Sequence, residues 1–377
     1  MKTRFTLFSL ILIFGIFTIQ AQKLALANEN GKFGYITKTG DWKIKPSFKN
    51  AKNFSDDVAQ ASENGKLWGF IDRNGKWVIE PSFEKTKRFD SGVAVVLKDK
   101  VWYYINKKGE KVLADVTTEK VFDFVNGYAI IRQGDFVGFI NTSGKEVVKP
   151  KFTKAFNFID GYAKVREGDK WGLIDTSGNY YVKTEYDGVS DAYNGNIVAN
   201  KGETYGLIVN GTFKEVSGAV KIWDFSNNAN YTYAKKDDKI GFIDKSGNWI
   251  IEPSFDKARA FKNGLAPVMK NKKWGYVNTK GEMVIEAKYK DAEIFSADGL
   301  APVKTDKLWG FADKTGEMVI EDKYAITAGG FSVFKKNNQK GFVNGLARVK
   351  SKKGWAFLKP DGNLLKDTWF KNLELFN

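Results

Sequence analysis

A short motif that recurs through nearly the whole chain constrains the fold more than any other feature. It consists of a large apolar residue, a central residue that is usually glycine, and a second large apolar residue. The central positions are separated by 35, 34, 35, 34, 34, 35, 34, 35 and finally 46 residues. A fixed period of this length indicates an array of small units that complete each other's core. The ten copies are Phe33-Gly34-Tyr35, Trp68-Gly69-Phe70, Trp102-Tyr103-Tyr104, Val137-Gly138-Phe139, Trp171-Gly172-Leu173, Tyr205-Gly206-Leu207, Ile240-Gly241-Phe242, Trp274-Gly275-Tyr276, Trp309-Gly310-Phe311 and Trp355-Ala356-Phe357.

Other positions repeat in the same frame and predict the structure of one unit. A glycine follows the central position by six residues in nine copies, an Asp or Asn by three in seven, and an aromatic residue by fourteen in eight. In the copy from Leu265 to Ile285, large side chains alternate in three short runs, which is the period of β-strands. Asn278 to Gly281 has the residues of a tight hairpin between the second and third runs. Each unit is therefore predicted to be a three-stranded antiparallel meander.

The second copy shows the full pattern and carries a family resemblance. It reads Trp68-Gly69-Phe70-Ile71-Asp72, then Gly75, then the strand Trp77-Val78-Ile79-Glu80-Pro81. This pattern resembles the WG repeat family of bacterial proteins, also called WG beta repeats, over about residues 24–372. The resemblance implies an all-β repeat region of the sort found in exported and multidomain bacterial proteins, usually without an assigned activity. It offers no catalytic residues to transfer. The third, sixth and tenth copies depart from the pattern.

The fold class is thus predicted to be all-β, and the array is either open or closed. Every unit appears complete in the same order, so no strand is left over to interlock the termini, and ten units exceed the four to eight blades usual in a propeller. We therefore predict an open, twisted array, with a closed propeller-like ring or rings as the alternative. A hairpin shortened by one residue marks a possible bend near residues 205–215, and the long final spacing places an insertion at about 326–340.

The central glycine itself carries a prediction. We expect it to let an aromatic ring from a neighbouring strand or unit lie against bare backbone. Its replacement by Tyr103 and Ala356 then indicates that the third and tenth copies are looser than the others or terminal.

The first 21 residues have the pattern of a secretory signal peptide. Lys2 and Arg4 precede an apolar run from Phe5 to Ile19, and Ala21 supplies the small residue that a signal peptidase needs. We expect cleavage there, which leaves residues 22–377 as the repeat domain, without an integral membrane span. The alternative is an uncleaved membrane anchor. The predicted location is outside the cytoplasm, in the periplasm, on the cell surface or in the medium.

The composition excludes several classes of site. The sequence contains no His and no Cys, which rules out Ser-His-Asp triads, thiol nucleophiles, disulfides and His- or Cys-ligated zinc and haem. A pair of carboxylates can hydrolyse a glycosidic bond, and this remains a minor alternative. However, Asp72, Asp175, Asp244 and Asp313 recur at one hairpin position, where a role in the turn explains them. We therefore expect a protein that is not an enzyme and that holds no metal or cofactor.

The formal net charge is +16, and many lysines fall in the turn that precedes the motif. Aligned in a stack, these turns would form a positive ridge that attracts an anionic polymer such as an acidic glycan, lipopolysaccharide or extracellular DNA. The alternative is that the lysines only keep the surface soluble. The predicted ligand-binding lysines are Lys235, Lys236, Lys239, Lys270, Lys272, Lys273, Lys350, Lys352 and Lys353.

The function predicted from these features is that of a non-catalytic exported binding or scaffold protein. Its repeat surface would engage either another envelope protein or the anionic polymer. The main alternative is a structural spacer without a specific ligand. The sequence does not determine the oligomeric state.

Overall fold

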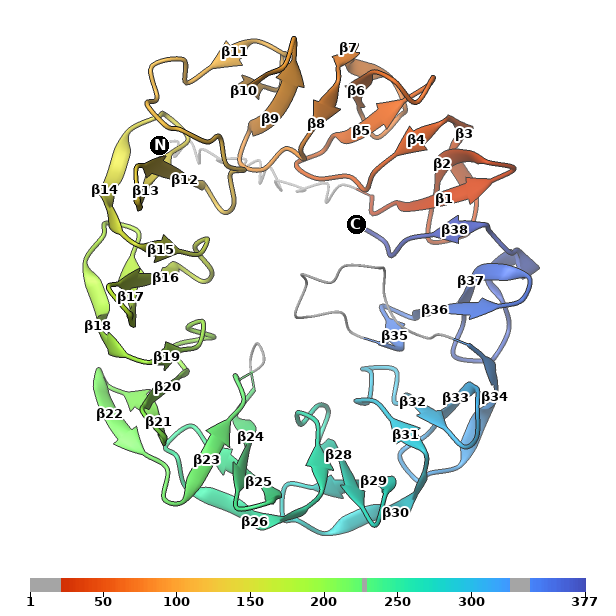
Figure 1. Ribbon diagram of the computed structural model, residues 1–377. Coiled ribbons are helices and arrows are strands. Elements are labelled where there is room, and N and C mark those ends of the chain that lie inside the picture. Colours follow the sequence, from red (N-terminus) through yellow and green to blue (C-terminus); the bar gives the residue numbers. More distant parts are fainter. Residues whose placement is uncertain (1–21, 226–228, 326–339) are drawn as a thin grey trace, which may run out of the picture.

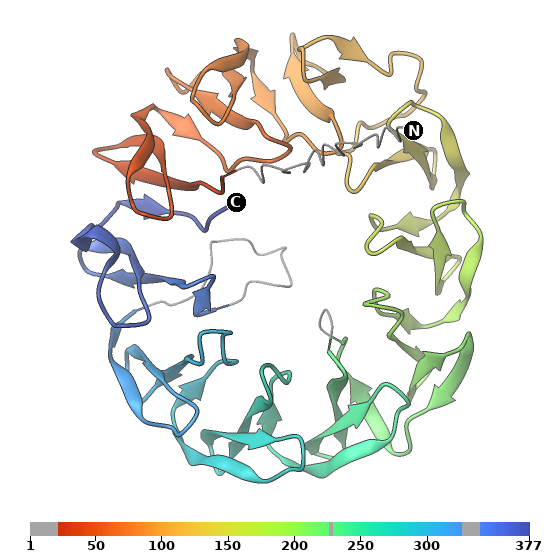
Figure 2. The same ribbon diagram turned by 180° about the vertical axis from the view of Figure 1, so that it is seen from behind.

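The computed structural model describes residues 22–225, 229–325 and 340–377. They form ten small antiparallel sheets, here called blades 1 to 10 in chain order, arranged as a closed ring (Figure 1). Figure 2 shows the same ring from behind. The all-β prediction is confirmed, and among the described residues the only helical element is the short 3-10 turn η1 (Leu365–Asp367).

Each blade runs from the centre of the ring to its rim. Figure 1 shows this order in blades 5 and 6, where β15 and β19 face the centre and β18 and β22 lie on the rim. The strands nearest the centre are β38 (Asn372–Leu373), β4 (Asn50–Ala51), β8 (Lys85–Thr86), β15 (Lys154–Ala155), β19 (Gly188–Val189), β23 (Ala219–Ile222), β27 (Lys257–Ala258) and β31 (Asp291–Ala292). The second strands are β1 (Ala25–Glu29), β5 (Ala59–Ser62), β9 (Val93–Lys98), β12 (Tyr128–Gln133), β16 (Tyr162–Glu167), β20 (Ile197–Lys201), β24 (Tyr231–Lys236), β28 (Leu265–Lys270), β32 (Ala301–Lys304) and β36 (Leu346–Ser351).

The third strand of each blade contains the repeated motif, and the outer strand follows the hairpin. The third strands are β2 (Lys32–Ile36), β6 (Trp68–Ile71), β10 (Val101–Asn106), β13 (Phe136–Asn141), β17 (Lys170–Asp175), β21 (Thr204–Val209), β25 (Lys239–Asp244), β29 (Lys273–Asn278), β33 (Trp309–Ala312) and β37 (Gly354–Leu358). The outer strands are β3 (Trp42–Phe48), β7 (Trp77–Phe83), β11 (Lys111–Val112), β14 (Glu146–Phe152), β18 (Tyr180–Tyr186), β22 (Thr212–Glu215), β26 (Trp249–Phe255), β30 (Met283–Tyr289) and β34 (Met318–Tyr324). In blade 10, β35 (Phe342–Val343) pairs with β36.

The three-stranded unit predicted from the sequence is incomplete. The connector after most outer strands contributes a further strand, usually of two residues, that joins the next blade. For example, Lys257 and Ala258 of β27 pair with Met269 and Val268 of β28. Eight blades are therefore four-stranded, and blades 4 and 10 have three strands in the described part of the chain.

The preferred prediction of an open array is wrong, and the alternative of a closed ring is the one observed. The last connector has no following blade, and its strand β38 pairs instead with β1 of blade 1. The amides of Lys371 and Glu374 donate to the carbonyls of Asn28 and Leu26 at 3.1 and 2.8 Å. The segment that the repeat frame assigns to the last unit thus completes the first blade and closes the ring.

The central glycine is required by an approach of backbone to backbone, not by the aromatic ring predicted. In blade 8, Trp274 pairs with Tyr289 and Tyr276 with Ile285, so a bulge in β30 lies opposite Gly275. A Cβ on Gly275 would lie 2.4 Å from the carbonyl oxygen of Ile285. Any residue other than glycine would therefore push the outer strand off its neighbour.

The aromatic residue fourteen positions after the motif centre packs between consecutive blades. Phe48 of blade 1 makes an edge contact with Trp77 of blade 2, with ring centroids 5.7 Å apart, and Phe152 of blade 4 contacts Tyr180 of blade 5 at 6.3 Å. These rings bury the apolar faces of neighbouring blades, which is why one blade cannot fold alone.

The predicted signal peptide, insertion and bend each concern one segment of the chain. The predicted signal peptide at 1–21 lies outside the described residues, as does the predicted insertion at about 326–340 apart from Lys340. Around residues 205–215, β21 and β22 pair without the bulge seen in most other blades, through a tight turn at Asn210 and Gly211, and the ring continues through this region (Figure 1).

Candidate functional site

The nine predicted lysines lie in the turns between the second and third strands of blades 7, 8 and 10. Since strand direction alternates, all these turns emerge on the same face of the ring. Blades 7 and 8 are neighbours, whereas blade 9 separates blade 8 from blade 10 (Figure 1). The closed ring spreads the turns around a circle, so the straight ridge expected for an open stack does not form.

Several of these lysines are already engaged by neighbouring side chains. Lys235 pairs with Asp238 at 3.1 Å, and Lys239 pairs with Asp256 at 2.5 Å. The ammonium of Lys350 lies 5.2 Å from the centroid of the Trp355 ring. Lys236 is half-buried. These four are thus poor candidates for an independent anion site.

The other predicted lysines are exposed at two turns. Lys270, Lys272 and Lys273 surround Asn271 in blade 8, where Asn271 and Lys272 have φ of 53° and 62°. Lys352 and Lys353 form the corresponding turn of blade 10 and are also exposed. The blade 8 turn is the denser concentration of positive charge.

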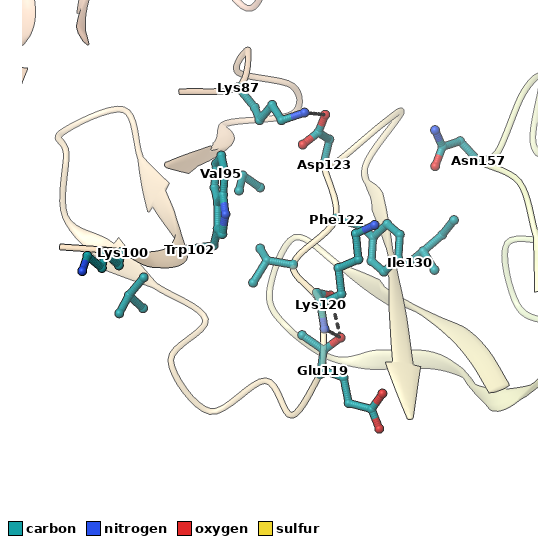
Figure 3. Close-up of a pocket in the computed structure, with 13 residues that line it drawn as sticks. Lys87, Val95, Lys100, Trp102, Glu119, Lys120, Phe122, Asp123, Ile130 and Asn157 are labelled. Carbon is teal, nitrogen blue, oxygen red and sulfur yellow. Dashed lines mark hydrogen bonds and ion pairs between the residues drawn. The ribbon is translucent and has the colours of Figure 1, made fainter. Parts of the chain in front are cut away.

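A groove with a volume of about 810 Å³ lies between blades 3 and 4 (Figure 3). Figure 3 shows Trp102 and Val95 on one side and Phe122 and Ile130 on the other. We call it the blade 3/4 groove. The residues that line it are Lys87, Val95, Lys100, Val101, Trp102, Thr118, Glu119, Lys120, Val121, Phe122, Asp123, Ile130 and Asn157.

The groove exists because the outer strand of blade 3 stops early. Strand β11 pairs only with Tyr104 and Ile105 of β10. The chain then turns away at Leu113, which has φ of 57°, and the amide of Val116 closes the turn by donating to the Leu113 carbonyl at 3.2 Å. Blade 3 has Tyr103 where most blades have glycine, and a side chain there blocks the bulged course of a full outer strand.

The aromatic residue that fills this space in other blades is also missing. The residue fourteen positions after Tyr103 is Thr117, and it is exposed. Without a ring between blades 3 and 4, Trp102 remains 38% exposed and Val101 56% exposed. The groove is therefore the volume that the second half of an outer strand occupies elsewhere in the ring.

The backbone of Trp102 lacks the pairing that its equivalents have. In blade 10, the equivalent Trp355 donates to Phe370 at 2.8 Å and accepts from Phe370 at 2.7 Å. The described chain provides no such fourth-strand partner for Trp102, because β11 ends before it. The edge of β10 thus presents an N–H and a C=O toward the groove.

The far wall of the groove is held in place by hydrogen bonding and charge. The Tyr104 hydroxyl donates to the carbonyl of Phe122 at 2.9 Å, and burial raises the pKa of Tyr104 to about 12. Lys87 reaches across from blade 3 to Asp123 at 3.9 Å, at one end of the groove (Figure 3). The ammonium of Lys120 lies 5.1 Å from the centroid of the Phe122 ring. The wall is therefore pre-formed.

The sequence did not predict this groove, although it contained two signals for it. Both the loss of glycine at Tyr103 and the loss of the aromatic at Thr117 fall in one copy. None of the nine predicted lysines lines the groove, whereas Lys100, from the corresponding turn of blade 3, does. Within the described residues no three Asp or Glu side chains gather as a metal site, and no helix has the length and apolar character to cross a membrane.

Solved structures with a similar arrangement of strands share little sequence with this chain. A eukaryotic initiation factor is 12% identical over 79% of this chain and 95% of its own, with a TM-score of 0.44. BamB from Moraxella catarrhalis is 11% identical over 79% and 90%, with a TM-score of 0.31. The WD40 β-propeller domain of Doa1 is 15% identical over 58% and 88%, with a TM-score of 0.26. These similarities carry no argument about function. No curated protein matches the sequence.

The family model for the WG containing repeat matches more than half of the chain. The matched residues are 33–66, 68–102, 138–171, 171–205, 240–274, 274–309 and 309–339. The matches leave out residues 103–137, 206–239 and 340–377, which contain the third, sixth and tenth copies. Blade 3, which opens the groove, is thus one of the units that have diverged from the family pattern. The chain belongs to the WG containing repeat family.

Proposed function

We propose that this protein is a non-catalytic, exported binding or scaffold protein whose blade 3/4 groove receives another protein of the cell envelope. Export is supported by the charged and apolar pattern of residues 1–21. The absence of His and Cys from the sequence argues against most nucleophilic and metal-dependent chemistry.

One observation carries the proposal. The outer strand of blade 3 is only two residues long, and the space that this leaves contains an exposed Trp102 beside an exposed Val101. Large apolar side chains left exposed in a pre-formed groove are typical of binding sites. A spacer without a ligand has no need of an opening at this point, since the other blades show how the same repeat closes it.

Site-specific photo-crosslinking in cells that produce the protein tests the proposal. A photoreactive amino acid replaces Val101 in the full-length chain, and the control carries it at Val319, which is 49% exposed on the complete outer strand β34. We expect a protein adduct of one discrete mass from position 101 and none from position 319. The absence of an adduct at 101, or equal adducts at both positions, would refute the proposal.

A second candidate function is the binding of an anionic polymer, which the exposed turn of blade 8 favours. Lys270, Lys272 and Lys273 lie in one turn and face solvent. Their field attracts polyanions and is screened by salt. The protein should bind polygalacturonate or DNA resin at low salt and elute as salt rises.

Replacement of six turn lysines by Gln tests this second function. The changes are Lys270→Gln, Lys272→Gln, Lys273→Gln, Lys350→Gln, Lys352→Gln and Lys353→Gln. We expect the variant to elute at clearly lower salt with an unchanged unfolding midpoint. Unchanged retention of the variant would show that the basic turns are not the site.

A further inference from the structure

We propose that the blade 3/4 groove binds an extended peptide segment of the partner protein, which adds to β10 as the missing part of the outer strand. This inference rests on the proposed function and specifies the partner's form. Addition of a strand to an exposed sheet edge is a general mode of peptide recognition, in which main-chain hydrogen bonds supply affinity and side-chain pockets supply specificity.

The other blades show what fits this space. In seven blades the outer strand ends in an apolar residue, three further residues and an aromatic residue, as in Ile251 to Phe255 and Ile320 to Tyr324. In blade 3, Leu113 already fills the apolar position. A Cβ on Gly144 of blade 4 would lie 3.1 Å from the Leu113 side chain. The equivalent contact in blades 7 and 8 is the same, since a Cβ on Gly281 would lie 3.3 Å from the side chain of Ile251. Only the last few residues of the strand are therefore missing.

The free backbone edge defines the register of the missing segment. Trp355 of blade 10 exchanges two backbone hydrogen bonds with Phe370. Trp102 is the equivalent residue of blade 3, so the aromatic residue of a bound peptide should form the same pair of bonds with it. This register places the peptide's ring in the groove between Trp102 and Phe122, where the rings of complete blades lie between their neighbours.

The charge of the groove favours acidic residues in that segment. In blade 5 the residue after the aromatic is Asp187, whose carboxylate accepts from the amide of Gly202 at 2.5 Å. In blade 3 the chain's own Glu119 takes this place, because its carboxylate accepts from the amide of Gly134 at 2.8 Å. No ion pair engages Lys100 or Lys120 among the residues that the structure describes, and both are exposed at the groove. The preferred segment is thus an extended stretch that carries acidic residues and ends in an aromatic residue.

A short peptide that copies the chain's own outer strand provides the probe. The peptide Glu-Pro-Ser-Phe-Asp reproduces residues 252–256 of blade 7, carries a fluorophore, and is titrated with the full-length protein by fluorescence polarisation. We expect saturable binding. Replacing the peptide's Phe by Ala should weaken binding at least about tenfold, because the groove loses its ring. Absence of saturable binding would overturn the inference.

Methylation of the backbone nitrogen of the same Phe separates strand addition from simple burial of the ring. The methyl group removes the N–H that would donate to the Trp102 carbonyl and leaves the side chain intact. We expect a loss of at least about tenfold in affinity. Equal binding of the methylated and unmethylated peptides would overturn the strand geometry.

Protein variants locate the site. Trp102→Ala should abolish binding, while Trp309→Ala, the same change in blade 9 with its complete outer strand, should leave it unchanged. Because Trp102→Ala removes a large side chain, the exposed Lys120→Glu serves as a second variant and should weaken binding several-fold through repulsion of the peptide's acidic residue. Binding that survives both changes would overturn the assignment.

The outcomes distinguish this inference from the proposed function. A crosslinked adduct at position 101 together with no peptide binding would leave the binding function intact and refute the strand geometry. Loss of the adduct when polygalacturonate is added before irradiation, with no effect of the peptide, would replace strand addition by polymer binding in the groove.

Discussion

Blades 3 and 8 have the same hairpin and differ in the residue at the motif centre and in the outer strand that follows the hairpin. In both, an Asn side chain closes the turn, since Asn106 accepts from the amides two and four residues later at 2.9 and 3.1 Å, and Asn278 does so at the same distances. In blade 8 the outer strand then runs on to Tyr289 over Gly275. In blade 3 it stops at Val112 beside Tyr103. The presence of one glycine and one aromatic thus accompanies a closed interface, and their absence accompanies a groove.

The largest effect should come from removal of the aromatic that fills the interface. Tyr289 is 2% exposed, and its hydroxyl donates to the carbonyl of Gly316 at 2.8 Å. Tyr289→Ala should lower the free energy of unfolding by about 4 kcal/mol, because it leaves a cavity and an unpaired carbonyl. At the matched position of blade 3, Thr117→Ala should change it by less than about 0.5 kcal/mol. Denaturant unfolding of both variants measures this, and equal losses would contradict the difference between the blades.

The central glycine should have the next largest effect. In Gly275→Ala the new Cβ meets backbone atoms of Ile285 and Ala287 at 2.4 and 2.8 Å, which side-chain rotation cannot relieve. We expect a loss of about 3 kcal/mol. The control is Gly264→Ala, whose Cβ meets nothing within 4 Å although φ is 89°, with an expected loss of about 1 kcal/mol from backbone strain alone. If Gly264→Ala proved the more damaging change, the backbone approach would not explain the motif.

The two hairpins should behave alike. Asn106→Ala and Asn278→Ala each remove an acceptor for two backbone amides, and each should cost about 1 kcal/mol. Unfolding midpoints of the two variants should therefore agree closely. A clearly smaller loss for Asn106→Ala would show that blade 3 is already loose at its hairpin, not only beyond it.

The smallest effect concerns hairpins that use Asp in place of Asn. The pKa of Asp313 in blade 9 lies below its ordinary value of 3.8, first because the Thr315 hydroxyl donates to it and also because the amides of Thr315 and Glu317 do. A lowered folded-state pKa gives stability that is present above the ordinary pKa and is lost as pH falls through the folded-state pKa. Asp313→Asn keeps the acceptor but does not titrate.

We therefore expect Asp313→Asn to lose less stability than the parent chain as pH falls below 4, with the same stability at pH 7. The contribution is small because the carboxylate is only partly buried, and solvent screens it. Unfolding midpoints as a function of pH measure it, and parallel curves for the two proteins would contradict it.

The repeat frame predicted the strands well because side-chain alternation and turn residues are local signals. Closure was mispredicted because the innermost strands are mostly two residues long and leave no periodic pattern. The position of the closing strand nevertheless follows from the same repeat frame. Strand β27 starts sixteen residues after the motif centre Gly241, and β38 starts sixteen residues after the motif centre Ala356. The last connector therefore had an unpaired strand that only blade 1 could accept.

The groove was only partly predictable. Tyr103 and Thr117 marked blade 3 as different in the sequence. That this difference opens a hollow depends on Phe122 and Ile130, which belong to the next blade and line the groove only when the two blades pack together. Lys235 and Lys239 were predicted as ligand-binding residues for a related reason. Their ion pairs with Asp238 and Asp256 form only when the turns are folded, so the sequence does not indicate them.

Hydrogen exchange at two tryptophan amides tests the central claim most directly. Trp102 and Trp274 occupy the same position of the motif, but only Trp274 has an outer-strand partner, Tyr289. The account predicts that the Trp274 amide is protected by at least about a thousandfold, as in a stable sheet, and that the Trp102 amide exchanges far faster, as at a free edge. Equal, strong protection of both amides would show that blade 3 has a complete outer strand and no open edge.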